Sequence, residues 1–157
     1  MTTPLSLTAL PGLAKTLSVP AYSRDSLTPG IVHFGIGNFH RAHEAMYLDK
    51  LFELGEGHDG AIIGAGVRQS DAEMREKLEA QDWLTTLVER DAFGQSARVT
   101  GAMMDFVPVF DTEALLGWLS DPRIRIVSTT ITEGGYYLDS DSKFDPTHPD
   151  IAADGNN

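Results

Sequence analysis

The segment from Gly30 to Asp49, GIVHFGIGNFHRAHEAMYLD, places groups that can bind an anion beside groups that can carry a proton. An apolar run ends in Gly35-Ile36-Gly37 and continues directly into a helical pattern. A strand, a tight glycine turn and a helix start direct free backbone N–H groups and the positive end of the helix dipole at one point. The segment therefore predicts an anion site, most often filled in proteins by the pyrophosphate of a dinucleotide.

The residues that follow the turn extend this candidate site. In the pattern G-x-G-x-x-G the third glycine would fall at position 40, where this chain has histidine. We expect the glycine turn and the first helical turn to contact the phosphates or the nicotinamide end of the cofactor. These candidate cofactor-binding residues are Gly35, Ile36, Gly37, Asn38, Phe39, His40 and Arg41.

Two histidines of this segment raise the alternative of a metal site. His40 and His43 are three residues apart, so we predict that they share one helix face with Glu44 beside them. The spacing is not that of H-E-x-x-H, and the nearest third ligand, His33, lies inside a strand. We therefore expect no metal. Each histidine is equally well explained as a hydrogen-bonded packing residue.

An acidic residue follows the second apolar strand, as dinucleotide-binding folds require. Asp71 is the candidate for the adenosine ribose, where a carboxylate accepts hydrogen bonds from the diol and repels a 2′-phosphate. This favours NAD over NADP, although nearby Arg68 would tolerate NADP. Alternatively, Ser70 or Asp71 caps the next helix, with Glu73 as the capping-box partner of Ser70. One aspartate can do both.

The second candidate region is TITEGGY, residues 130–136. It follows the last apolar strand, at the carboxyl edge where open α/β sheets bind their ligands. Thr130 is a candidate for contacting the cofactor. Glu133 precedes two glycines and is the candidate for the edge of the active site, as a proton relay or a hydrogen-bond acceptor. A plain loop carboxylate is the alternative.

The apolar periodicity predicts the elements that hold these residues. We expect an irregular lead-in over residues 1–29 with one short helix, and a cofactor-binding domain over residues 30–157. Buried strands alternate with helices, which predicts a Rossmann-like, doubly wound, mostly parallel α/β sheet with three parallel strands here. A β-hairpin is inserted at Gly94. The expected strands are 30–36, 61–67, 83–90, 97–110 and 124–131, and the expected helices are 38–53, 70–80 and 111–119.

Composition excludes several classes of function. The net charge of −11 argues against nucleic acid and anionic membranes as partners. With no cysteine, there are no disulfides, thiolate nucleophiles or cysteine-ligated metals. The N-terminal region lacks an apolar stretch of signal-peptide length, so we expect a cytoplasmic protein.

The motifs together resemble the mannitol dehydrogenase family of long-chain, metal-independent polyol and sugar-acid dehydrogenases. The matching segments are HFGIGNFHRAHEAMYLDKL, IIGAGVRQSDAEMREKLEAQDWLTTLVER and RIVSTTITEGGYYLDSDSKFDPTHPDI. The resemblance implies an NAD-dependent oxidoreductase of carbohydrate metabolism that converts a secondary alcohol of a sugar alcohol into a ketose, as mannitol into fructose. It places the pyrophosphate at Gly35 and Gly37, the ribose at Asp71 and the active-site edge at Glu133.

The resemblance also implies what this chain lacks. Family members are several times longer, and their general-base lysine lies in a second, largely helical domain. We therefore expect a truncated chain that holds the cofactor, lacks the catalytic domain, is inactive alone and is prone to self-association. The alternatives are a non-catalytic nucleotide-binding or regulatory module, a fructuronate or tagaturonate reductase of the same family, and a metal-dependent hydrolase using His40 and His43.

Overall fold

The computed structural model describes residues 4–155, and only the backbone of Glu133 and Gly134. Its centre is a four-stranded parallel sheet in the order β5-β2-β1-β6. The strands are β1 (Pro29–Phe34), β2 (Ala61–Ala65), β5 (Met103–Phe106) and β6 (Ile126–Thr129). The chain runs outward from β1 to β2 and β5, then crosses back to β6 on the other side of β1. The strand order therefore reverses at β1, as a doubly wound sheet requires.

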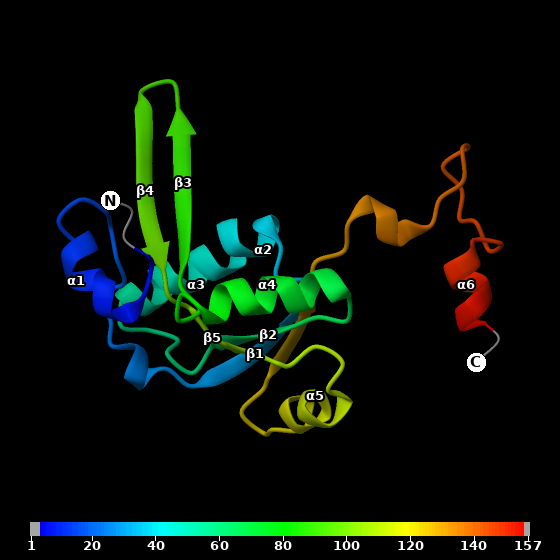
Figure 1. The fold of residues 1–157 in the computed structure, drawn as a ribbon, viewed down its shortest axis with the longest axis horizontal. Helices are drawn as coiled ribbons and strands as arrows, with labels where there is room; N and C mark the ends of the chain where they lie inside the picture. The colour runs from blue at the N-terminus through cyan, green and yellow to red at the C-terminus, as the bar shows by residue number, and fades with distance from the viewer. Residues whose placement is uncertain (1–3, 156–157) are drawn as a thin grey trace.

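Helices cover both faces of this sheet (Figure 1). One face packs against α3 (Glu44–Glu53) and α4 (Gln69–Glu79), through a core that includes Ile62, Phe52 and Leu78. The other face packs against α5 (Thr112–Leu119) through a smaller cluster around Val32 and Ile63. Asp111 caps α5 by accepting a hydrogen bond from the Ala114 N–H at 2.9 Å, at the start of the helix expected over residues 111–119. Neighbouring residues of β1 and β2 thus serve opposite cores.

The predicted hairpin is confirmed, but the strand expected over residues 97–110 is wrong. The hairpin consists of β3 (Thr85–Asp91) and β4 (Gly94–Thr100) and projects away from the parallel sheet (Figure 1). The chain leaves it at Gly101, whose N–H donates to the Asp49 carboxylate at 2.8 Å. It then enters the parallel sheet as β5, so that residues 103–106 supply a fourth parallel strand where three were expected.

The single helix expected over residues 38–53 is also wrong. The structure has two helices, α2 (Asn38–Ala42) and α3, separated by His43 with φ −123° and ψ −76°. The break lies directly before Glu44, whose carboxylate binds His33 on β1 and Ser128 on β6. These bonds to the sheet compensate for the interrupted helix. The sequence pattern along the helix does not predict them.

β6 differs from the buried strand that its apolar sequence predicts. It pairs with β1 on one side only, and Ile126 and Val127 remain 52% and 55% exposed. The sheet therefore ends, within the described residues, in an apolar edge. The predicted self-association remains a prediction, for which this edge offers a surface.

The segments on either side of the sheet contain short helices. The lead-in forms η1 (Leu7–Ala9), α1 (Leu10–Leu13) and η2 (Arg24–Ser26), and joins the hairpin at a Ser18–Arg98 bridge. After β6 the chain forms η3 (Glu133–Tyr136) and α6 (Pro149–Asp154), which lie apart from the sheet (Figure 1). Across residues 4–155, the helices all fall short of the length and apolar character that crossing a bilayer demands.

Candidate functional site

The glycine turn lies at the carboxyl end of β1, where the strand order reverses. Gly35 has φ +91°, a conformation that glycine adopts without strain. Its N–H donates to the carbonyl of Ala65 at the end of β2, at 3.1 Å. A Cβ at Gly35 would lie 3.4 Å from the carbonyl oxygen of Thr130, just beyond β6. The turn is therefore fitted closely between the ends of β2 and β6.

Donor groups follow the turn at the start of α2. The first hydrogen bond of the helix runs from the Arg41 N–H to the Gly37 carbonyl at 3.2 Å, so the N–H groups of residues 38–40 precede it. Gly37 and Asn38 are exposed, and Phe39 is 65% exposed. Ile36, in contrast, is buried in the core, so only its backbone can face a ligand.

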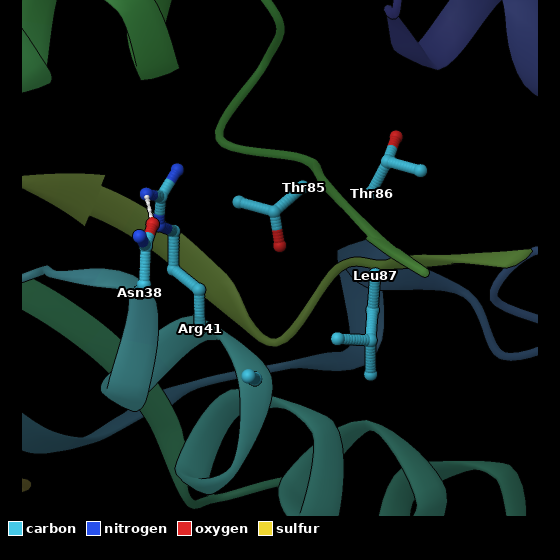
Figure 2. A pocket seen from close by; sticks show the side chains of 6 residues that line it. Asn38, Arg41, Thr85, Thr86 and Leu87 are labelled. Carbon is cyan, nitrogen blue, oxygen red and sulfur yellow. Dashed lines mark hydrogen bonds between the residues drawn. The ribbon is translucent and has the colours of Figure 1, made fainter. Parts of the chain in front are cut away.

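Arg41 folds back over the turn. Its Nε donates to the Gly37 carbonyl at 3.3 Å and its Nη2 donates to Asn38 Oδ1 at 2.6 Å. Figure 2 shows this pair on one side of a hollow of about 210 Å³ between α2 and the start of β3. The arrangement keeps a guanidinium beside the exposed glycine turn. The hollow is lined by Asn38, Arg41, Ala42, Thr85, Thr86 and Leu87.

Asp71 lies in the first turn of α4 and caps that helix. Its Oδ2 accepts hydrogen bonds from the N–H groups of Val67 and Arg68, both at 2.9 Å. Only glycine fits at position 66, because a Cβ there would lie 2.3 Å from the Asp71 Cβ. Of the two expected caps, Asp71 is confirmed, whereas Ser70 with Glu73 as its partner is wrong: α4 begins at Gln69, and Asp71 reaches back to the preceding loop. Both bonds end on Oδ2, so neither uses Oδ1.

Beneath the turn lies a polar cluster that the sequence alone does not predict. His33, which is 2% exposed, uses Nδ1 to contact Glu44 Oε2 and Ser128 Oγ, each at 2.8 Å. Its Nε2 contacts Thr130 Oγ1 at 2.9 Å. The ring of His40 stacks on the ring of His33 with centroids 4.1 Å apart. The cluster thus joins β1, β6, α2 and α3 directly below the candidate site.

Burial determines the charge state of this cluster. The pKa of His40 falls from 6.5 to about 4, because burial and the neighbouring His33 both disfavour its protonated form. Burial alone would raise the pKa of Glu44, but its hydrogen bond and charge interaction with His33 lower that pKa overall. At neutral pH a neutral His40 ring therefore lies over His33, and an ionised Glu44 accepts hydrogen bonds.

The prediction that His40 and His43 share one face is wrong. His40 is 1% exposed and faces the sheet, whereas His43 is exposed and lies against Phe39 with ring centroids 4.7 Å apart. Because His40 is buried, only its backbone N–H remains a candidate for contacting phosphate. The pair also cannot jointly bind a catalytic metal, which removes the basis for the hydrolase alternative.

A different trio, His33, His40 and Glu44, has its potential ligand atoms within 4.8 Å of one another. Two features argue against a metal there. Both nitrogens of His33 already contact protein groups. The two imidazoles are stacked with only 25° between their planes, so their in-plane lone pairs do not converge on one ion.

The two remaining candidates lie beyond β6. Thr130 is half-buried at the carboxyl edge, with its N–H bonded to the Phe34 carbonyl at 3.0 Å and its hydroxyl bonded to His33. The backbone of Glu133 begins η3, and its side chain lies outside the described residues. His33 was missed as a site residue, although one polar residue in an otherwise apolar strand is a readable signal.

The strand order, its reversal at β1 and the glycine turn define a Rossmann-type α/β domain. Comparison with known families specifies it further. The chain belongs to the mannitol dehydrogenase family, because the model described as the mannitol dehydrogenase Rossmann domain matches residues 29–154.

The names of individual relatives are consistent with this family. The chain is 62% identical over 143 residues to mannitol 2-dehydrogenase of Cereibacter sphaeroides, covering 90% of this chain and 30% of that protein. It is 44% identical over 150 residues to polyol:NADP oxidoreductase of Gluconobacter oxydans, covering 92% and 30%. The structure resembles Pseudomonas fluorescens mannitol 2-dehydrogenase in a ternary complex with NAD and D-mannitol, with a TM-score of 0.84 and 42% identity, covering 97% and 32%. The chain thus spans about a third of the length of these relatives.

Proposed function

We propose that this chain is the coenzyme-binding part of an NAD-dependent polyol dehydrogenase that interconverts a secondary alcohol of a sugar alcohol and the corresponding ketose. The observation that carries the proposal is the Gly35–Gly37 turn at the point where the strand order reverses. In doubly wound sheets this point receives the dinucleotide. The relatives named for mannitol oxidation, and the NAD and D-mannitol bound in one of them, support the coenzyme and the substrate class.

The residues of the turn fit the coenzyme's pyrophosphate. The exposed backbone of Asn38 and Phe39 supplies N–H donors, and Gly35 allows close approach because it carries no side chain. The guanidinium of Arg41, which is held beside the turn, supplies positive charge. Because the net charge of the chain is −11, these local donors, and not the overall field, must attract the phosphates.

The two halves of the coenzyme then lie on opposite sides of the turn. Asp71, after β2, would accept hydrogen bonds from the adenosine ribose through Oδ1, while Oδ2 keeps its capping role. Thr130, after β6, lies on the nicotinamide side, and Glu133 follows it at the active-site edge. When bound, the nicotinamide accepts or returns a hydride. The acid–base lysine belongs to the second domain that the family resemblance implies.

Tolerance of NADP is a second feature of the proposal. Arg68 is exposed and its backbone N–H donates to the Asp71 carboxylate at 2.9 Å, so its guanidinium is the candidate for binding a 2′-phosphate. The relative from Gluconobacter oxydans is named as an NADP enzyme. We therefore expect NADH to bind more tightly than NADPH, with both detectable.

A titration tests the proposal. The chain, shown to be folded by circular dichroism, is mixed with NADH or NADPH while the reduced-nicotinamide fluorescence is followed. A saturable change that is tighter for NADH supports the proposal. A folded sample that changes the fluorescence of neither coenzyme refutes it for this chain.

A further inference from the structure

Thr130, His33 and Glu44 form a continuous hydrogen-bonded chain below the candidate coenzyme site. The Thr130 hydroxyl lies 2.9 Å from His33 Nε2, and His33 Nδ1 lies 2.8 Å from Glu44 Oε2. Ser128 Oγ donates to the second carboxylate oxygen, Glu44 Oε1, at 3.1 Å. The chain therefore connects the carboxyl edge of β6, through the interior of β1, to the first turn of α3.

The chemistry of these groups determines the direction of each bond. The ionised Glu44 carboxylate only accepts, so His33 Nδ1 carries a hydrogen and donates it. In the tautomer with its hydrogen on Nδ1, Nε2 is an acceptor, and the Thr130 hydroxyl donates to it. The hydroxyl proton is thereby directed inward, and the Thr130 oxygen is left as an acceptor.

The surroundings hold this arrangement in place. His33 is 2% exposed, and the neutral ring of His40 covers one of its faces at a centroid distance of 4.1 Å. Thr130 itself is held by the hydrogen bond from its backbone N–H to the Phe34 carbonyl at 3.0 Å. The Thr130 hydroxyl oxygen, an acceptor whose orientation these contacts determine, thus lies next to the glycine turn, on the side of β1 opposite to Asp71.

We propose that His33 and Glu44 are positioning residues that hold the Thr130 hydroxyl as an acceptor for the carboxamide N–H of the nicotinamide ring. This inference rests on the proposed coenzyme function, and assigns to Thr130 the recognition of the coenzyme's nicotinamide half. An NAD molecule carries that carboxamide donor, whereas ADP-ribose lacks the nicotinamide ring entirely. The two compounds therefore separate this contact from the rest of the site.

The test compares the dissociation constants of NADH and ADP-ribose for the 157-residue chain and its variants, by fluorescence and calorimetry. Thr130→Val removes the hydroxyl and keeps the shape. It should weaken NADH binding about three- to tenfold, the range expected for one hydrogen bond, and change ADP-ribose binding less than about twofold. Thr130→Ser restores the hydroxyl and should recover most of the loss. Thr129→Val is the matched control, because the adjacent side chain points to the other face of β6.

The positioning role is tested at the far end of the chain. Glu44→Gln places an amide where the carboxylate accepted hydrogen bonds, so it no longer sets which nitrogen of His33 carries the hydrogen. It should weaken NADH binding in the same direction as Thr130→Val, again without affecting ADP-ribose. His33→Phe, where the variant folds, should reproduce the effect of Thr130→Val.

The outcomes separate the inference from the function it rests on. If the folded wild-type chain binds neither NADH nor ADP-ribose, the proposed function fails. If it binds both, and Thr130→Val or Glu44→Gln changes them equally or not at all, the inference is overturned and the proposed function stands. A selective loss for NADH in both variants supports the inference.

Discussion

Replacement of Asp49 by alanine should destabilise the fold by about 3 kcal/mol. The Asp49 side chain is completely buried on α3 and accepts three hydrogen bonds. Tyr22 donates from the lead-in at 2.6 Å, Gly101 from the end of the hairpin at 2.8 Å, and Arg98 from β4 at 3.3 Å. One carboxylate therefore joins the lead-in, the hairpin and the helix that follows the candidate site.

The magnitude follows from these partners. Removing one member of a buried, hydrogen-bonded ion pair typically costs about 3–5 kcal/mol. The lower end applies here, because burial raises the pKa of Asp49 by more than its hydrogen bonds and the charge of Arg98 lower it. A raised pKa means that ionisation of the buried Asp49 carboxyl lowers the stability of the fold as the pH rises through the folded-state pKa, because the carboxylate is desolvated. Alanine removes this desolvation cost together with the hydrogen bonds.

Urea unfolding at pH 7, followed by far-UV circular dichroism, measures the effect. Asp49→Asn is the informative second variant: it keeps one acceptor oxygen for Tyr22 and Gly101 but turns an amide donor toward Arg98, so it should lose less than alanine. Asp141→Ala, at an exposed position, is the control and should change stability by less than about 0.5 kcal/mol. A loss below about 1 kcal/mol for Asp49→Ala, with an unchanged urea dependence, would refute the reasoning.

Three further results are expected. Burial lowers the pKa of His40 from 6.5 to about 4, so its stabilising contribution is complete above pH 6.5 and is lost as the pH falls toward 4. This loss, roughly 3 kcal/mol when complete, should be seen in urea unfolding of the wild-type chain and should be absent from His40→Gln. Asp71→Ala should bring the dissociation constants of NADPH and NADH closer together and should lower the free energy of unfolding by about 1 kcal/mol. An unchanged ratio of the two dissociation constants would mean that Asp71 only caps α4. Gly64→Ala should destabilise by about 1–3 kcal/mol, because a Cβ there would lie 2.9 Å from Phe106, whereas Gly117→Ala, with open space around it in α5, should stabilise slightly in thermal unfolding.

Much of the fold could be predicted because its signals are local. The apolar runs before Gly35 and over residues 61–65 form adjacent buried parallel strands, as their lack of polar alternation indicates. Gly94 and Asp91 close the predicted hairpin, with Asp91 Oδ1 accepting from the Gly94 N–H at 2.9 Å. In each case the residues that determine the structure lie within a few positions of one another.

The errors come from contacts between distant residues. The helix break at His43 precedes Glu44, which binds a strand 84 residues further along the chain. Periodicity along one element contains no information about such partners.

The candidate site likewise has one part that the sequence predicts and one part that it does not. The glycine turn could be identified from sequence, because the positive φ of Gly35 is a conformation that glycine adopts readily. The polar cluster beneath it could not, because it requires knowing that β6 lies beside β1 and that α3 covers both. His40 illustrates the difference: its position in the motif suggested a ligand contact, and its burial directs the ring inward.

The central claim is that the dinucleotide binds over the Gly35–Gly37 turn. Backbone amide NMR of the uniformly ¹⁵N-labelled chain, titrated with NADH, tests it directly because each N–H reports its own surroundings. The account predicts that the largest shifts fall on residues 35–41, with further shifts at residues 67–71 and at Thr130. Shifts confined to the hairpin or to α5, or a folded chain whose spectrum does not change at saturating NADH, would contradict it.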